Sequence, residues 1–167
     1  DACGVCDGPA TDPSQCIPVA EIAITELVAN GDLWTATINM SNTAGIAGWQ
    51  FQVTSNPDMM ELVAAYGGSS EAAGHQVSSA TNGTVLGFSM VGTEIPFGNT
   101  ALVYVDLDID NDYAILDIVD GVFSNAAGES IPVEYGDPYI FGTLPDIPDA
   151  PENLTAEVID NVNIQLN

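Results

Sequence analysis

The sequence contains no lysine and no arginine. A chain of average composition and this length would carry about 20 of them, so their absence affects the whole surface. Proteins that bind nucleic acid, or that lie on anionic membranes, use these two residues to neutralise phosphates. We therefore expect no nucleic-acid partner and no membrane-bound function.

Long apolar runs are also missing, because no stretch approaches the roughly 18 to 20 residues of a membrane-spanning helix. No segment with a charged start and an apolar centre, typical of a signal peptide, stands at Asp1. We expect no membrane insertion, and we interpret the sequence as a mature or excised piece of a longer one.

The charge that is present is almost all negative, since 24 acidic residues and one histidine give a formal net charge of −24 at pH 7. Self-repulsion at this charge density destabilises a compact chain unless salt, protons or divalent cations screen it. The lack of lysine and arginine also removes every trypsin-type cleavage site. Together these features favour an extracellular or cell-surface location.

Cysteine is scarce, and all three copies lie in the first sixteen residues, at Cys3, Cys6 and Cys16. Their neighbours are mainly turn-forming Gly, Pro and Asp, which could not shelter a free thiol, so disulfides are expected. The odd number leaves one cysteine free or bonded elsewhere, and the pairing stays open. A metal site is the weaker alternative, because a fourth Cys or His ligand is missing.

Short apolar alternations begin at Val19 and are separated by turn residues such as Asn30-Gly31 and Asn82-Gly83. No segment carries a helical period over three turns. A helical turn and a strand are equally compatible with residues 57–65. Strands are predicted at residues 22–29, 33–40, 48–55, 60–66, 75–80, 84–91, 100–109, 113–118, 121–125 and 131–141. The pattern predicts an all-β protein, an antiparallel β-sandwich or jelly roll of about nine strands.

The composition changes twice along the chain, which divides it into three parts. Residues 1–17 form a Cys/Gly/Asp segment that we expect to be tied by a disulfide, and residues 18–142 form the sandwich. Residues 143–167 combine a proline-rich linker with an orphan strand segment. One or two strands are not stable alone, so this segment must pair with another domain or chain. The candidates for such strand addition are Glu157, Ile159, Val162, Ile164 and Leu166.

The region from Val19 to Phe141 resembles the cohesin-like domains. The similarity lies in LWTATINMSNTAGIAGWQFQVTS at residues 33–55, in TVLGFSMVGTEIPFGNTALVYVDLDI at 84–109 and in GVFSNAAGESIPVEYGD at 121–137. The second stretch contains the turn Gly92-x-x-Ile95-Pro96-x-Gly98. The resemblance implies a non-catalytic jelly-roll sandwich that presents a sheet face to a protein partner, which in cellulosomes is a dockerin.

Both ends of the chain also resemble known modules. The tail PDAPENLTAEVIDNVNIQLN, at residues 148–167, is similar to the start of a fibronectin type III domain. The head DACGVCDG, followed by Cys16, resembles small Asp-Cys-Gly-x-Cys repeats between the modules of large secreted microbial proteins. These similarities imply a modular extracellular protein.

Alternating acids give the clearest candidate for a cofactor site, which would bind calcium through Asp106, Asp108, Asp110 and Asp112. Leu107 and Ile109 between them are typical of a strand, so the three carboxylates from Asp106 to Asp110 would share one face. A solvated acidic face is the alternative interpretation. A helix-loop-helix calcium site is disfavoured, because Asn111 stands where that loop needs glycine.

Evidence for catalysis or sugar binding is weak. His75 is the single group able to transfer protons near neutral pH, and a lone histidine in a strand is usually structural. Carbohydrate binding, the less favoured alternative, would need several of the aromatic side chains Trp34, Trp49, Tyr66, Tyr104, Tyr113 and Tyr135 to share an exposed face. Glycosylation sequons begin at Asn39, Asn82 and Asn153.

The sequence therefore predicts a non-enzymatic, extracellular protein-binding or scaffolding module. The alternative is a structural subunit of an extracellular filament, in which the C-terminal strand of one molecule completes the sheet of the next. A protein partner or self-association is expected in both cases.

Overall fold

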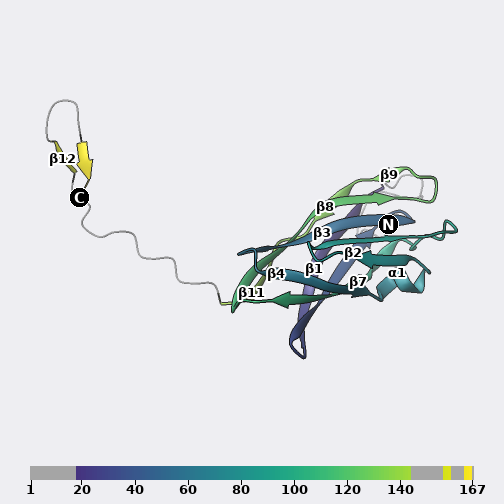
Figure 1. Ribbon diagram of the computed structural model, residues 1–167. Coiled ribbons are helices and arrows are strands. Elements are labelled where there is room, and N and C mark those ends of the chain that lie inside the picture. The colour runs from purple at the N-terminus through teal and green to yellow at the C-terminus, as the bar shows by residue number, and fades with distance from the viewer. Residues whose placement is uncertain (1–17, 144–155, 159–163, 167) are drawn as a thin grey trace.

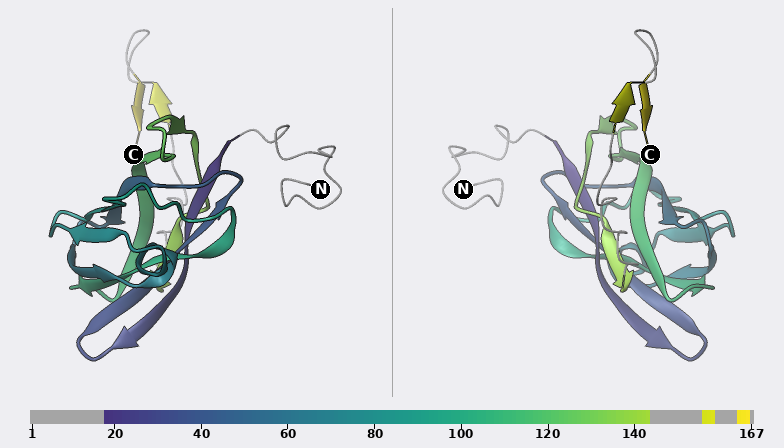
Figure 2. Two further views of the ribbon diagram at one scale, coloured as in Figure 1. Left: turned by 90° about the vertical axis from the view of Figure 1, so that its right-hand side faces the viewer. Right: turned by 90° about the vertical axis from the view of Figure 1, so that its left-hand side faces the viewer.

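The computed structural model describes residues 18–143, 156–158 and 164–166, and the first of these ranges forms two β-sheets packed face to face (Figures 1 and 2). The five-stranded sheet has the order β10 (Val133–Tyr135), β1 (Ala20–Asn30), β2 (Leu33–Asn42), β7 (Gly98–Ile109) and β4 (Met60–Tyr66). The second sheet has the order β11 (Tyr139–Gly142), β8 (Tyr113–Ser124), β3 (Gly48–Asn56), β6 (Thr84–Phe88) and β5 (Gln76–Ser79), and β9 (Ser130–Ile131) pairs with β8. Every pair except β1–β10 is antiparallel. The predicted all-β sandwich is confirmed.

The first hairpin has the predicted turn. Asn30 lies opposite Leu33, and Gly31 adopts a φ of 65° that an L side chain rarely accepts. From the turn, β2 alternates buried and half-buried residues, so Ala36, Ile38 and Met40 enter the core. This period of two fixes which face of the hairpin is apolar.

The core between the sheets is built from aliphatic side chains with a small aromatic centre. Trp49 and Phe51 on β3 stack with ring centroids 5.5 Å apart and an interplanar angle of 17°. Phe123 on β8 is also almost fully buried. Trp49 is accommodated because Gly87, its cross-strand neighbour on β6, has no side chain.

Three details differ from the sequence-based prediction. The two strands predicted at residues 113–118 and 121–125 form one strand, β8, which ends at Ser124, because a bulge with Asp120 at a φ of 54° lets the ladder continue. The segment expected as one strand at residues 131–141 divides into the end of β9, β10 and β11. Residues 60–66 form β4, and the one helix of the described chain, α1 (Gly68–Ala72), lies in a segment for which none was predicted.

The C-terminal strands β12 (Ala156–Val158) and β13 (Ile164–Leu166) pair with each other as an antiparallel hairpin. Of the strand-addition candidates, Glu157 lies in β12, and Ile164 and Leu166 lie in β13. Ile159 and Val162 fall outside the described residues, as do Cys3, Cys6, Cys16 and Asn153. None of the described helices has the length and apolar character required to cross a membrane.

Candidate functional site

The outer surface of the six-stranded sheet, here called the outer face, carries apolar side chains in neighbouring positions. Gln50 at its centre lies opposite Leu86 of β6 on one side and Val122 of β8 on the other. In the next row, Gly48 lies between Phe88 and Ser124. These strands are far apart in the sequence, so only the sheet register brings the residues together.

Two of these apolar side chains are strongly exposed. Val122 is 62% exposed and Phe88 is 43% exposed, although both lie on well-paired strands. Around them is a shallow hollow of about 260 Å³ that is lined by Gly48, Trp49, Gln50, Leu86, Gly87, Phe88, Val122 and Ser124. Exposed apolar positions that are contiguous on a sheet are typical of a binding surface.

The outer surface of the five-stranded sheet carries a set of hydrogen-bonded polar side chains. The Thr35 hydroxyl donates a hydrogen bond of 2.6 Å to Oδ1 of Asp106, and the Tyr66 hydroxyl donates to the same oxygen at 3.2 Å. Asn39 donates through Nδ2 to Oδ1 of Asn99 at 2.6 Å. These bonds join side chains of β2, β4 and β7, and the strands of this sheet also carry exposed apolar residues, with Val28 and Val63 each 51% exposed.

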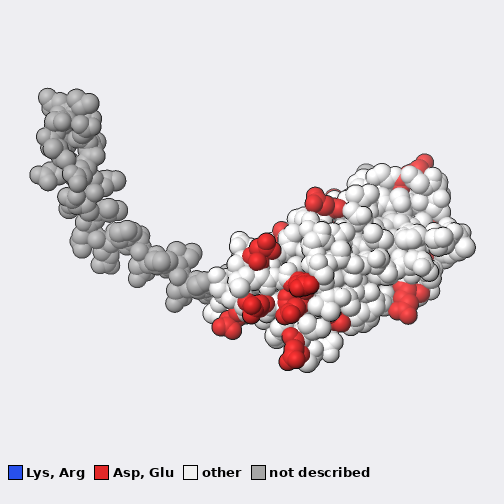
Figure 3. Space-filling model, viewed as in Figure 1, with Lys and Arg blue, Asp and Glu red and all other residues white. Residues whose placement is uncertain are grey.

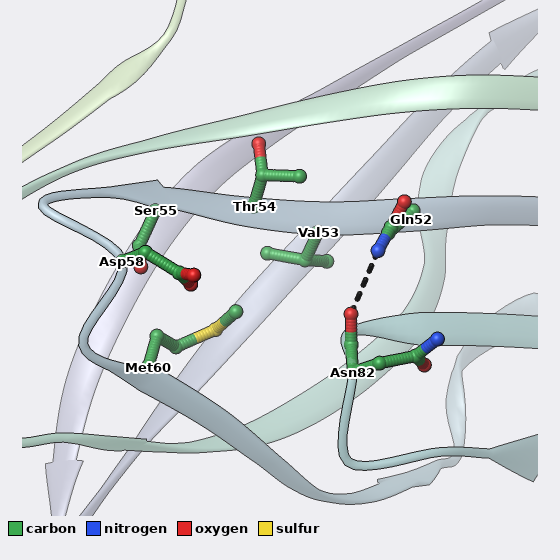
Figure 4. Close-up of a pocket in the computed structure, with 7 residues that line it drawn as sticks. All are labelled: Gln52, Val53, Thr54, Ser55, Asp58, Met60 and Asn82. Atoms are coloured by element: carbon green, nitrogen blue, oxygen red, sulfur yellow. Dashed lines mark hydrogen bonds between the residues drawn. The ribbon is translucent and has the colours of Figure 1, made fainter.

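A larger cavity, here called the end pocket, lies where β3 turns into β4 (Figure 4). Its volume is about 480 Å³. Its lining residues are Gln52, Val53, Thr54, Ser55, Asp58, Met60 and Asn82. The Gln52 side chain donates through Nε2 to the carbonyl oxygen of Asn82 at 2.8 Å, which ties β3 to the β5–β6 turn (Figure 4).

The predicted calcium residues do not converge on one point. Asp106 is engaged by Thr35 and Tyr66, whereas Asp108 and Asp110 line a separate hollow beside β4. Within the described ranges, no three His, Cys, Asp or Glu side chains form a group that could hold a metal ion. Calcium binding by Asp106, Asp108, Asp110 and Asp112 stays a prediction without geometric support.

His75 is a buried structural residue in this fold, with 7% exposure. Its Nε2 lies 3.1 Å from the carbonyl oxygen of Thr93, and its Nδ1 has no partner among the described residues. Burial lowers the pKa of His75 below 6.5, although the bond to Thr93 acts in the opposite direction. The ring therefore holds the β6–β7 loop through Thr93.

The predicted aromatic residues are divided between the core and the surface. Trp49 is buried, and Trp34 packs edge-on against Phe141 with ring centroids 4.7 Å apart. Tyr66 and Tyr104 lie 6.2 Å apart between ring centroids, and the Tyr135 hydroxyl accepts a hydrogen bond from the Gly121 amide. Trp49 is thus not available to a sugar-stacking platform, and sugar binding by the other aromatic residues stays a prediction.

Two sequons fall in the described residues. Asn39 lies within β2, where its side-chain amide is bonded to Asn99, and Asn82 lies in the exposed β5–β6 turn. The turn is the more accessible of the two positions, and glycosylation at either stays a prediction.

The sequence matches no family model and none of the curated proteins. Solved structures with the same fold are cohesins. The sixth cohesin of scaffoldin B from Acetivibrio cellulolyticus, solved in complex with a dockerin, superposes with a TM-score of 0.57 at 14% identity, over 74% of this chain and 97% of its own. A non-cellulosomal cohesin from Archaeoglobus fulgidus superposes with a TM-score of 0.52 at 15% identity, and the match covers 74% of this chain and 87% of that cohesin. The seventh type I cohesin of a Pseudobacteroides cellulosolvens protein superposes with a TM-score of 0.55 at 16% identity, and the match covers 80% of this chain and 97% of that cohesin.

The chain has a cohesin-like fold. This confirms the resemblance found in the sequence, and identities of this size establish the fold alone. The sequence reasoning missed the hollow of the outer face, which is assembled from strands that are distant in the sequence, and the end pocket, where Asn82 of the β5–β6 turn meets residues 52–60. A local signal existed only for the outer face, where Gly48 and Val122 occupy outward positions of alternating strands.

Proposed function

We propose that this chain is a non-catalytic protein-binding module of a secreted or cell-surface modular protein, and that it binds its partner on the outer face. The observation that carries the proposal is the exposure of Phe88 and Val122 on either side of β3. A rigid sheet loses little conformational entropy when a partner covers it, so exposed apolar groups on it contribute efficiently to binding.

The outer face also has the features that give specificity. Gln50 is a polar group at the centre of the apolar rows, able to donate and to accept hydrogen bonds. Gly48, which has no side chain on the outer face, helps to leave the hollow beside Phe88 and Val122, into which a partner side chain can insert. An apolar patch with one central polar group and a surrounding hollow is typical of protein interfaces.

A dockerin is the partner class that we propose. It is supported by the cohesin-like fold and by the dockerin present in the complex of the Acetivibrio cellulolyticus cohesin. The charge of −24 further favours a partner whose contact surface is basic. The extracellular setting is supported by the same acidic composition.

Titration calorimetry against a panel of purified dockerins tests this proposal. We expect at least one to bind the chain and to bind the Val122→Glu variant at least about tenfold more weakly, since the variant places a charge in the apolar row. Val28→Glu is the matched control, because Val28 is similarly exposed, at 51%, on the other sheet. Absence of binding across the panel would refute the dockerin class, and equal effects of the two variants would refute the outer face.

An extracellular filament subunit is the second candidate, and the edge of β1 favours it. The β1 strand spans Ala20–Asn30, but β10 covers only Ala20 to Ile22 on that side. The remaining edge could accept a strand from the C-terminal segment of another copy. Light scattering after size exclusion checks this, since concentration-dependent oligomers would support self-association and a constant monomer would exclude it.

A further inference from the structure

The end pocket is a gap in the six-stranded sheet. The β3–β6 ladder ends at Gln52 opposite Thr84, followed by one bond of 2.9 Å from the Val53 amide to the Gly83 carbonyl. Strand β3 continues to Asn56 along β8, so among the described residues no strand lies beside its last residues on the β6 side. A strand that lacks a neighbour offers backbone donors and acceptors to an extended chain.

The lining of the end pocket suits a peptide. Figure 4 shows Ser55, Asp58 and Met60 on one side of the space and Asn82 on the opposite side, with the Asn82 side chain directed away from them. Amide and hydroxyl side chains match the donors and acceptors of a peptide backbone, and Met60 adds a flexible apolar contact. None of the described residues that line this pocket is aromatic, which disfavours a sugar ring as its ligand.

The electrostatics beside the end pocket define the charge of the ligand. Asp58 and Met60 also line a second hollow of about 430 Å³, which continues along β4 to Glu61 and Asp108. Glu61 and Asp108 are cross-strand neighbours, and the chain has no lysine or arginine to pair with them. Figure 3 shows acidic side chains concentrated toward one end of the sandwich on the side shown. A ligand that passes through both hollows would gain from carrying positive charge.

We propose that the end pocket and the adjoining hollow bind an extended segment of a partner protein that carries Lys or Arg. The segment lies alongside the end of β3, and its basic side chains reach Asp58, Glu61 and Asp108. This site is separate from the outer face and does not depend on the proposed dockerin binding. It gives the module a second interaction surface at one end of the sandwich.

Fluorescence anisotropy with labelled peptides tests the proposal. The probes are a peptide of alternating threonine and lysine and its analogue with glutamine in place of lysine. We expect the lysine peptide to bind and the glutamine peptide to bind at least about tenfold more weakly, because several exposed charge pairs are lost. In a ¹⁵N-labelled sample, bound peptide shifts the amide signals of Thr54, Ser55 and Met60.

Matched variants separate a specific site from general attraction to an acidic protein. The pocket variant carries Asp58→Asn, Glu61→Gln and Asp108→Asn. The control carries Glu21→Gln, Glu26→Gln and Asp32→Asn on the β1–β2 hairpin, where all three residues are exposed. The two variants have the same net charge, so non-specific attraction would weaken both equally.

The expected result is a loss of affinity of at least about fivefold in the pocket variant and less than about twofold in the control. Unchanged peptide binding by Val122→Glu would show that the site is independent of the outer face. Equal weakening of the two triple variants, equal binding of the two peptides, or signal shifts confined to the outer face would each overturn the proposal.

Discussion

Gly87 of β6 lies directly against the indole of Trp49 of β3. A Cβ built on Gly87 would stand 2.3 Å from Cζ2 and 2.4 Å from Cε2 of the Trp49 ring. Trp49 is 3% exposed and stacks on Phe51, so its ring cannot move without disturbing the core. The space left by one glycine therefore determines where the central aromatic residue of the sandwich packs.

The first prediction concerns this contact. Gly87→Ala should lower the free energy of unfolding by about 1–3 kcal/mol, because the added methyl group overpacks the core. Urea unfolding followed by Trp fluorescence measures it. Gly31→Asn, which adds a side chain in open space at a φ that Asn tolerates, should change stability by less than about 0.5 kcal/mol. Equal effects of the two substitutions would contradict this view of the core.

The second prediction concerns pH. Burial lowers the pKa of His75 in the folded chain. At a pH below 6.5, His75 therefore binds a proton more readily in the unfolded chain than in the folded one. The contribution of neutral His75 to the free energy of unfolding is complete above pH 6.5. It is lost as the pH falls through the pKa that His75 has in the folded chain. Unfolding measured from pH 7 to about pH 5 should show this loss in the native chain.

His75→Gln is the control for that experiment, since it keeps an amide donor for the Thr93 carbonyl and removes the titration. The difference in unfolding free energy between the native chain and the variant should shrink as the pH falls. A difference that stays constant over this range would show that His75 does not titrate differently in the folded state.

The third prediction concerns salt. At a net charge of −24 with no lysine or arginine, the folded chain is destabilised by repulsion between carboxylates. Sodium chloride shortens the Debye length and screens this repulsion. The melting temperature at pH 7 should therefore rise with added salt over the range in which screening changes most. A melting temperature that falls with salt would mean that attractive ion pairs dominate.

Local features of the sequence were sufficient to predict much of the sandwich. The Asn30-Gly31 turn and the alternation in β2 give the first hairpin without knowledge of any partner strand. The helix α1 is too short for a hydrophobic period, so no pattern could indicate it. The continuity of β8 depends on Asp120 adopting a positive φ, which is rare for residues other than glycine.

The candidate sites could not be predicted in the same way, because sheet register creates them. Leu86, Gln50 and Val122 form a row only after three separate strands have paired. The end pocket exists because β6 begins at Thr84 while β3 continues past it to Asn56. The acids of β7 were recognised in the sequence, but the contact of Asp106 with Thr35 and the proximity of Asp108 to Glu61 depend on their neighbours in the sheet.

Partner binding on the outer face is tested most directly by comparing the affinities of two variants and mapping the contact surface by NMR. A dockerin that binds the native chain is titrated separately with the Val122→Glu and Val28→Glu variants. Amide signals of the ¹⁵N-labelled native chain are then recorded with and without this dockerin. We predict that only Val122→Glu loses affinity and that the shifted signals centre on Gln50 and Phe88. Full affinity of Val122→Glu, with shifts on the five-stranded sheet instead, would contradict the account.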